Sequence, residues 1–429
     1  MTAPDAAAGG IGRLGRYLLV GSEKALRIPV GVLISGLASR ALGVEDFGLY
    51  TSVLVLLTVM APLASFGLES LGIALASRSR DAATYLRDLG LFRLLTGLAA
   101  AALFLVAALA YFAPAPGHPS LLALAAVAVV LVLRVYELAE NLLFAQERLL
   151  ALAGVRIIAF LAANALIAVV LLTRPDLSLL LILSAVEAVL LLVLYLVLCG
   201  ADVAAATRLP AEGHELGRAY AQCRAAFPVF LSGLLVLVLL NADKLLVFRV
   251  LGHSESGLYN AAAKLVDVLY FIPMVIGTTH ASSFARLAPG DGLWAAYRSA
   301  FRTATLASAA AAIGLAALAT VLVPRVYGES FAEAAPVLAL LAPCLVAVTW
   351  VSLRTRALAA LDRRAEILRL TGVAEVIHLP LLGVGLAVGH IEAVAVCQSV
   401  GWMLAAAVVP LFSSSARPLS PWHALWVRA

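Results

Sequence analysis

Charged side chains interrupt long apolar segments of this chain, and such residues could bind a charged ligand. Seven basic residues lie inside these segments, and they include every lysine of the protein: Lys24, Arg27, Arg93, Arg134, Arg156, Lys244 and Lys264. A charge at the centre of a bilayer is costly, so residues of this kind usually face the interior of a helix bundle. Arginine offers a planar fork and lysine a compact charge, and both groups bind phosphate. We therefore predict that Lys24, Arg27 and Lys244 line a cavity for an anionic ligand such as phosphate, with Arg134 and Lys264 as further candidates.

Carboxylates accompany several of these cations at helical spacing. Glu23 precedes Arg27 by four positions and Glu137 follows Arg134 by three, which places each pair within reach along a helix. Asp267 follows Lys264 by three, whereas Asp243 and Lys244 are adjacent and point in different directions. The alternative interpretation of Arg134–Glu137 and Lys264–Asp267 is therefore a pair of internal salt bridges that neutralise each other.

Four further charged residues lie in the apolar segments. Arg93 and Arg156 lie near the ends of their segments, and we expect their side chains to extend to the membrane surface. Glu187 and Glu375 are unpaired in the sequence. Two hypotheses stay open for these acids: titration in an ion- or proton-coupled step, or pairing across helices.

The elements that position these charges are membrane spans. The chain has 429 residues, of which 63% are hydrophobic and 13% are charged, and its mean hydropathy is +1.03. Soluble domains carry about 25% charged residues, so we predict an all-α polytopic membrane protein. A helix needs about 20 apolar residues to cross the hydrocarbon core. The predicted spans are 17–41, 51–76, 91–113, 120–144, 151–173, 177–200, 225–249, 257–284, 298–323, 332–353, 367–389 and 391–412.

A turn motif recurs at the end of the first span of each half. Arg40, Gly43, Gly48 and Tyr50 return at the same spacing as Arg249, Gly252, Gly257 and Tyr259. Chance matching in an apolar background is the alternative to duplication, but a matched arginine, two glycines and a tyrosine favour an internal repeat. In transporters built from repeats, the substrate route lies between the two copies.

The distribution of arginine fixes the expected orientation. Alternate connections are rich in arginine, whereas the opposite set carries few: Arg40, Arg174, Arg249 and Arg325. Cytoplasmic connections carry the excess of basic residues, so both termini are expected in the cytoplasm. The expected location is the inner (plasma) membrane. Six spans per half give the halves one topology, which makes them parallel repeats. We predict six-helix bundles at 1–200 and 225–412, a cytoplasmic linker at 201–224, and a cytoplasmic or interfacial tail at 413–429.

The sequence offers little for bond-making chemistry. The cysteines are scattered, without metal-ligand spacing: Cys199, Cys223, Cys344 and Cys397. A phosphate-binding P-loop motif is absent, as are the helical zinc motif and a nucleophile elbow. We predict a protein that is not an enzyme, with no cofactor, no metal and no nucleic-acid partner.

Four motifs carry a resemblance to a known family. They are Arg40-x-Leu-Gly-x-Glu-x-Phe-Gly-Leu-Tyr50, Leu251-Gly-x(4)-Gly-Leu-Tyr-Asn-Ala-Ala-x-Lys264, Val326-Tyr-Gly-Glu-x-Phe331 and Arg356-Ala-Leu-Ala-Ala-Leu-Asp-Arg363. Together they touch both halves of the chain. The sequence resembles the polysaccharide-biosynthesis transporters, the Wzx-type O-antigen and capsule flippases of the MOP flippase superfamily.

The resemblance implies a fold and an activity. The family fold is two six-helix bundles in a V that opens to either side in turn, as in the MATE-type exporters. Its substrate is an undecaprenyl-diphosphate-linked oligosaccharide, moved from the cytoplasmic to the periplasmic leaflet, and other polysaccharide-assembly proteins are possible partners. The basic cavity of the family maps best onto Lys24, Arg27 and Lys244.

Two other functions stay open. One is a small-molecule or drug exporter of the same superfamily, which a basic cavity disfavours. The other is a membrane polysaccharide ligase or polymerase. Enzymes of that kind usually carry a large external loop, whereas the predicted external connections here are short, and the connection at 113–120 contributes only His118.

Overall fold

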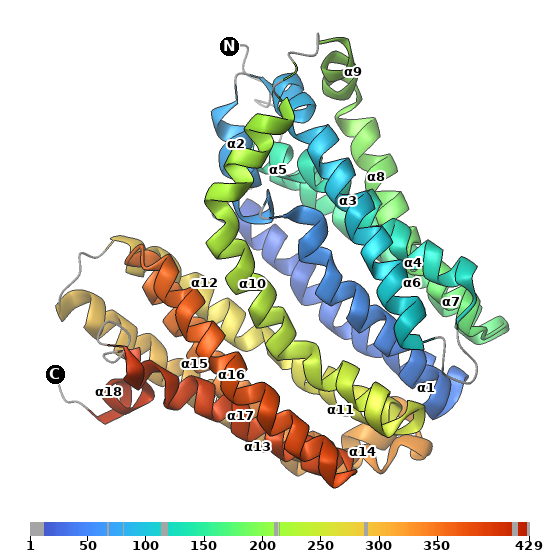
Figure 1. Ribbon diagram of the computed structural model, residues 1–429, viewed down its shortest axis with the longest axis vertical. Helices are drawn as coiled ribbons and strands as arrows, with labels where there is room; N and C mark the ends of the chain where they lie inside the picture. The colour runs from blue at the N-terminus through green and yellow to red at the C-terminus, as the bar shows by residue number, and fades with distance from the viewer. Residues whose placement is uncertain are drawn as a thin grey trace. The chain divides into compact units, whose positions relative to one another are not determined.

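The computed structural model describes residues 13–66, 68–79, 81–112, 119–209, 213, 215–286, 291–413 and 419–426. Helices, with short turns between them, account for the regular structure in these ranges. This arrangement confirms the prediction of an all-α polytopic protein (Figure 1). Lipid offers backbone groups no hydrogen-bond partners, so apolar segments of this length satisfy them internally as helices.

The helices of the first half are α1 (Arg13–Ser65), α2 (Leu68–Arg78), α3 (Ala82–Phe112), α4 (Leu121–Leu133), α5 (Glu137–Ala145), α6 (Leu149–Thr173), α7 (Leu177–Leu183), α8 (Val186–Leu198) and α9 (Gly200–Arg208). The second half contains α10 (Glu215–Leu251), α11 (His253–Leu269), α12 (Phe271–Arg286), α13 (Asp291–Tyr327), α14 (Ala334–Leu341), α15 (Cys344–Ala360), α16 (Arg364–Val388), α17 (Ile391–Ala407) and α18 (Pro421–Trp426). Short 3₁₀ turns occur at Arg134–Tyr136, Glu329–Phe331 and Val409–Phe412.

Several predicted spans consist of two helices in line. The span at 120–144 bends at the 3₁₀ turn between α4 and α5, and the span at 177–200 is interrupted between α7 and α8. Ten helical segments of the described residues are long and apolar enough to cross a membrane. The first of them, Leu26–Ser65, joins two predicted spans.

Glycines with positive φ make the two repeated turns. Gly43 interrupts α1 with a φ of 77°, and Gly252 separates α10 from α11 with a φ of 97°. Residues with a Cβ rarely adopt this conformation, so both turns depend on glycine. The matched glycines of the sequence motif therefore perform the same backbone role in both copies.

The chain packs as two compact units. Unit 1 comprises Met1–Ile34 and Met60–Phe227, and unit 2 comprises Ser35–Val59 and Pro228–Ala429. The middle of α1 thus packs with the second half of the chain. Helix α9 and the first turns of α10 occupy the predicted linker at 201–224. The division into six-helix bundles at 1–200 and 225–412 stays a prediction.

Each place where the chain passes from one unit to the other lies near a proline within a helix. Pro228 begins the unit 2 part of α10, and Pro62 follows the last unit 2 residue of α1 by three residues. Pro29 precedes the first crossing, between Ile34 and Ser35, by about one and a half turns. Proline removes a helical hydrogen-bond donor and weakens the helix at that turn. The connections between the units are therefore locally weakened helices.

Candidate functional site

Arg27 is held by three helices of unit 1. Its Nε donates to Glu23 Oε1 on α1 at 2.5 Å, and its Nη2 lies 2.8 Å from Glu187 Oε1 on α8. Its Cζ lies 4.5 Å from the centre of the Phe160 ring on α6, a cation–π contact. The side chain remains 34% exposed. The guanidinium is thus fixed in orientation but still open on one side.

A second arginine extends this network. Arg156 binds Glu140 through two hydrogen bonds of 3.0 and 2.8 Å, and its Nη1 lies 3.6 Å from Glu23 Oε2. The hydroxyl of Tyr195 donates to the same Glu140 at 2.9 Å. The sequence analysis missed Glu140 and Tyr195. Only the spacing of Glu140, three residues after Glu137 and thus on the same helix face, could have indicated a second acid.

The break between α4 and α5 positions a third group of charges. Arg134 begins the 3₁₀ turn and its Nη2 lies 2.6 Å from Glu137 Oε1, so the salt bridge expected from the sequence is present. Arg93 of α3 binds the other oxygen of Glu137. The expectation that Arg93 reaches the membrane surface is wrong, because its side chain is 2% exposed and this carboxylate holds it in the bundle. Arg156 likewise forms salt bridges inside unit 1.

The charges of the described network balance. Four guanidiniums face four carboxylates: Arg27, Arg93, Arg134 and Arg156 against Glu23, Glu137, Glu140 and Glu187. Arg27, Arg134 and Glu187 keep exposures of 34%, 25% and 29%. Charged groups in apolar spans face water or protein and not acyl chains, so these three mark a polar face of unit 1. Lys24 lies on α1, and its side chain is outside the described residues.

Unit 2 contains a smaller polar cluster. Lys244 of α10 is 6% exposed in its side chain, and its Nζ lies 2.6 Å from Asp267 Oδ2 and 3.3 Å from Asn241 Oδ1. The salt bridge expected between Lys264 and Asp267 is therefore replaced by one between Lys244 and Asp267. Lys264 is exposed on α11. Asp243 accepts a hydrogen bond of 2.7 Å from the Tyr259 hydroxyl.

Glu375 is a buried acid on α16. Its side chain is 5% exposed, and neither carboxylate oxygen has a hydrogen-bond partner among the described residues. One turn later, His378 is fully buried and shares a 2.6 Å hydrogen bond between its Nε2 and Gln398 Oε1 of α17. Buried polar groups normally have partners, so Glu375 is a candidate for proton binding, whereas Glu187 is paired with Arg27.

The two copies of the turn motif pack directly against each other within unit 2. A Cβ on Gly48 would come within 2.7 Å of the Gly257 nitrogen, and a Cβ on Gly257 would overlap the Val44 carbonyl oxygen. The hydroxyls of Ser52 and Ser256 meet across the same crossing at 3.0 Å. Small residues allow this close approach of two helix backbones. The two copies of the motif thus contact each other through matching residues.

The arginines of the motif behave differently. Arg40 donates a 2.5 Å hydrogen bond to the Arg325 carbonyl near the end of α13. Arg249 is exposed, and no equivalent hydrogen bond is present within the described ranges. Phe47, between the two motif glycines, packs edge-on against Phe331 with ring centres 5.5 Å apart. The first copy therefore contacts the α13 end of unit 2.

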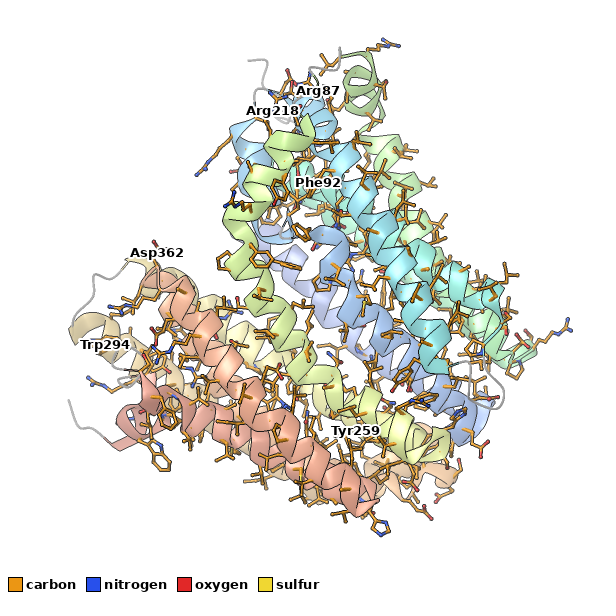
Figure 2. The ribbon with its side chains drawn as sticks, in the orientation of Figure 1. Arg87, Phe92, Arg218, Tyr259, Trp294 and Asp362 are labelled. Carbon is orange, nitrogen blue, oxygen red and sulfur yellow. The ribbon has the colours of Figure 1, made fainter. Side chains whose placement is uncertain are left out.

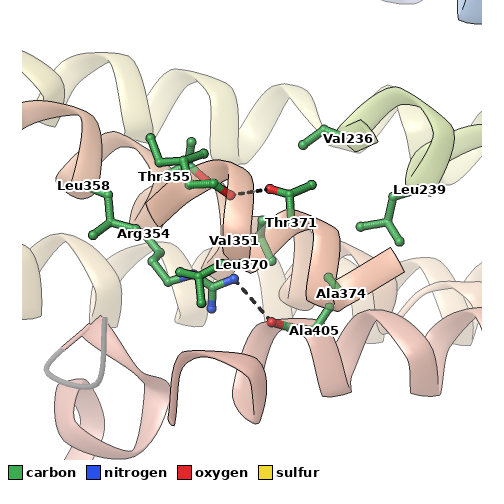
Figure 3. Close-up of a pocket in the computed structure, with 11 residues that line it drawn as sticks. Val236, Leu239, Val351, Arg354, Thr355, Leu358, Leu370, Thr371, Ala374 and Ala405 are labelled. Atoms are coloured by element: carbon green, nitrogen blue, oxygen red, sulfur yellow. Dashed lines mark hydrogen bonds between the residues drawn. The ribbon is translucent and has the colours of Figure 1, made fainter. Parts of the chain in front are cut away.

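A separate cavity of unit 2 is closed by a buried arginine (Figure 3). Arg354, 4% exposed, donates to the carbonyls of Ala405 and Ala406 at 3.2 and 2.9 Å. These are carbonyls of the last turn of α17, where a cation is favoured. The cavity holds only about 10 Å³ between α10, α15 and α16, so Arg354 has a structural role.

The fold is that of the MOP superfamily transporters. The lipid II flippase MurJ in its inward closed conformation aligns with a TM-score of 0.65 at 11% identity, over 92% of this chain and 86% of that chain. An inward-facing multidrug resistance MATE family transporter of the superfamily aligns with a TM-score of 0.63 at 15% identity, over 90% and 92%. A MOP superfamily transporter from Pyrococcus furiosus aligns with a TM-score of 0.56 at 14% identity, over 94% and 95%.

The sequence then gives the family within this fold. Residues 37–336 match the family described as polysaccharide biosynthesis protein, and the chain belongs to that family. The resemblance inferred from the four motifs is thereby confirmed. No curated protein matches the chain.

Proposed function

We propose that the protein is a flippase for a polyprenyl-diphosphate-linked oligosaccharide, which it moves from the cytoplasmic to the outer leaflet by alternating access. The family assignment supports a role in polysaccharide biosynthesis. The observation that carries the proposal is the polar face of unit 1, where Arg27, Arg134 and Glu187 remain accessible within apolar spans. A lipid-linked sugar needs such a polar route, since neither diphosphate nor sugar hydroxyls can cross hydrocarbon unpaired.

Arg27 is the residue best placed to receive the diphosphate. Its Nη2 contacts Glu187, which is itself 29% exposed, whereas its Nε is held by the buried Glu23. A diphosphate can therefore replace Glu187 on the open side while Glu23 keeps the guanidinium in place. Fork-shaped pairing of arginine with phosphate is strong and directional. Release of the ligand would restore the Arg27–Glu187 pair, which makes this salt bridge an exchangeable contact.

The remaining predicted site residues have supporting parts in this proposal. Arg134 offers a second partly exposed guanidinium on the same unit, and Lys24 follows Glu23 on α1. Lys264 is the exposed cation of unit 2, whereas Lys244 is largely occupied by Asp267. Asp243 and Asp267 hold the polar cluster of unit 2, and Glu375 is the acid proposed to bind a coupling proton.

The proposed orientation places both termini in the cytoplasm of a plasma-membrane protein, because the basic connections lie on that side. Enzyme-reporter fusions after residue 208 and after residue 252 test it. The first fusion should report a cytoplasmic position and the second an external one. The reverse pattern would exclude the direction of transport proposed here.

Transport of a lipid-linked oligosaccharide into the outer leaflet of proteoliposomes, read by a lectin or glycosidase added outside, tests the function. Arg27→Ala should abolish this transport. The double variant Arg27→Ala/Glu187→Gln should also be inactive, which would show that the loss does not come from the unpaired Glu187 carboxylate that the single variant leaves. Arg174→Ala, in the turn after α6, is the matched control with normal transport. Normal rates in both Arg27 variants would remove Arg27 from the mechanism. Export of a cationic drug without oligosaccharide transport would favour the exporter alternative.

A further inference from the structure

The turns that follow α5 and α15 share an unusual geometry. Each places an acidic residue in the left-handed region, Glu147 with a φ of 56° and Asp362 with a φ of 54°. The next residue is an arginine in both turns, and its backbone N–H donates at 2.9 Å to the carbonyl five residues earlier. Residues with a Cβ rarely adopt this conformation, so its recurrence indicates that α5 and α15 are equivalent helices of the two halves.

A polar side chain of each of these helices lies against a buried glycine. In unit 1, Asn141 of α5 lies on Gly72 of α2. In unit 2, Arg356 of α15 lies on Gly277 of α12 in the same way. Both polar residues stand seven positions before the arginine of their turn, and a Cβ on either glycine would overlap the polar end of the side chain. Equivalent positions therefore hold a neutral amide in unit 1 and a guanidinium in unit 2.

The two side chains differ in their partners. Asn141 forms a hydrogen bond with the hydroxyl of Tyr85, a buried tyrosine in the first turn of α3. The buried tyrosine near the start of α13, Tyr297, donates its hydroxyl to the Leu419 carbonyl at 2.9 Å. Nε of Arg356 is buried without a hydrogen-bond partner, and no described carboxylate forms a salt bridge with its guanidinium. Buried charge without a partner is costly, so Arg356 indicates a ligand that completes its hydrogen bonds.

Arg356 lies near the end of unit 2 that carries basic connections. Its position is one turn before the end of α15 at Ala360, or about 6 Å along the helix axis. Figure 2 shows Trp294, at the start of α13, and Asp362 at this end of unit 2, with Tyr259 towards the other. The orientation proposed above places this end at the cytoplasmic leaflet, where the fixed anions are lipid phosphates.

An arginine at this depth can simply extend to interfacial water. Arg356, however, is partly buried, and its Nε is shielded from solvent. The guanidinium has room because residue 277 carries no side chain, and an arginine that only extended to water would not need that room. The nearby Arg363 is exposed, as that simpler role requires. Arg356 is therefore held against α12, and its two Nη groups are left to bind a ligand.

We propose that Arg356 binds the phosphate of a lipid headgroup at the cytoplasmic end of unit 2, with Gly277 as the residue that positions the guanidinium. The two Nη groups form a planar fork that matches two phosphate oxygens. The phosphate comes from the polyprenyl diphosphate of the proposed substrate or from an anionic phospholipid of the membrane. The inference rests on the proposed function for the first of these sources and for the orientation.

Native mass spectrometry of the purified protein during a lipid titration tests the proposal, since it counts bound lipids and gives their dissociation constants. The probe is a polyprenyl diphosphate, and the background is Arg27→Ala, which removes the site proposed in unit 1. Arg27→Ala should still bind one lipid. Adding Arg356→Gln should weaken this binding at least about tenfold, because hydrogen bonds to a charged group are lost.

Adding Arg363→Gln to the same background is the matched control. This exposed arginine lies in the turn that follows α15, so its loss removes the same charge without touching the proposed site. Binding should be unchanged. Equal affinity in the Arg356→Gln and Arg363→Gln double variants would overturn the proposal.

The two glycines provide a second matched pair. Gly277→Ala places a Cβ on Nε of Arg356 and should weaken lipid binding. Gly72→Ala disturbs the equivalent contact of Asn141 and should leave binding unchanged. Both variants should lower the midpoint of thermal unfolding, so weaker binding in Gly277→Ala alone reports the position of the guanidinium and not a loss of stability. Equal binding by both variants would remove the positioning role of Gly277.

Three other ligands distinguish the sources of the phosphate. Phosphatidylglycerol that binds as tightly as the polyprenyl diphosphate, and loses affinity in Arg356→Gln, identifies a site for membrane phospholipids. Weaker binding of phosphatidylglycerol identifies an entry site for the substrate. Diacylglycerol lacks a phosphate and inorganic diphosphate lacks a tail, so both should bind weakly. Binding of either one as tight as that of the lipid phosphate would overturn the proposal.

Failure of the flippase proposal is read separately. Absent oligosaccharide transport by the wild-type protein, with lipid binding that still depends on Arg356, would exclude the flippase and retain this site. Normal transport with lipid binding that does not depend on Arg356 would exclude this site and retain the flippase.

Discussion

The crossing of the two motif glycines predicts a large and specific cost for a single methyl group. In Gly257→Ala the new Cβ would lie well under 3.0 Å from the Val44 carbonyl oxygen and at 3.0 Å from its carbon. The obstructing atoms belong to a backbone and cannot rotate away. Overpacking of this kind costs about 1–3 kcal/mol. Alanine also recovers about 0.5–1 kcal/mol of helix propensity, so we expect a net loss of about 1–2 kcal/mol.

Gly314→Ala provides the matched control. Gly314 lies within α13 of the same unit, and a Cβ there meets nothing within 4 Å. This variant should gain about 0.5–1 kcal/mol from propensity alone. The two variants should therefore differ by about 1.5–3 kcal/mol. Each kcal/mol shifts the midpoint of thermal unfolding by roughly 2–4 °C in a domain of 150–250 residues, so Gly257→Ala should unfold roughly 3–12 °C below Gly314→Ala.

The assay is thermal unfolding of the purified protein in detergent at one fixed heating rate. The reciprocal variant Gly48→Ala should behave like Gly257→Ala, because its Cβ would meet the His253 carbonyl and the Gly257 nitrogen. One separation of the backbones would accommodate both methyls, so the double variant should cost less than the sum of the two. Equal midpoints for Gly257→Ala and Gly314→Ala, or strict additivity, would refute the packed crossing.

The other predictions concern buried polar groups. Lys244→Met should destabilise unit 2 by about 1 kcal/mol, because the buried Lys244 loses its hydrogen bonds whereas Asp267 is 34% exposed and can be hydrated. Lys244→Met/Asp267→Leu should recover most of this loss in thermal unfolding, and equal loss in both variants would contradict the pair. Glu375→Gln should keep or raise the unfolding midpoint, because the neutral amide needs no charge to be buried. It should also remove the pH dependence of transport, and an unchanged pH profile would exclude Glu375 as the proton-binding group. Burial raises the pKa of the Cys199 thiol above its usual range, and a raised pKa lowers the fraction of reactive thiolate. Maleimide should therefore modify Cys199 rapidly only after the protein unfolds, as followed by mass spectrometry. Fast labelling of the folded protein would contradict the burial of Cys199.

The sequence was sufficient for the backbone features that depend on local chemistry. Gly43 and Gly252 were matched by spacing, and both adopt the positive φ that glycine permits. The spans follow from the length of the apolar segments, because backbone N–H and C=O groups in lipid have to form their hydrogen bonds within a helix. Within the described ranges, the helices of α10 to α17 follow the order of the predicted spans.

The polar contacts were harder to predict, since spacing shows what a side chain can reach and not what competes for it. Asp267 lies within reach of Lys264 along α11, but Lys244 of α10 approaches it more closely. Arg93 was expected at the surface because it lies near the end of its predicted span, yet Glu137 of the neighbouring α5 binds it inside the bundle. Contacts between distant residues, such as Gly48 with Gly257, leave no local pattern except their shared residue type.

The assignment of residues 35–59 to unit 2 has a consequence for biosynthesis. This segment is made early, but its packing partners begin at Pro228, roughly 170 residues later. At about 5–20 residues per second the ribosome needs about 10–35 s to supply them. During that interval the segment around Gly43 lacks its packing partners, and the side of the helix that carries Gly48 contacts lipid and not protein. Correct assembly therefore requires that this segment stay inserted in the bilayer until the second half of the chain has been made.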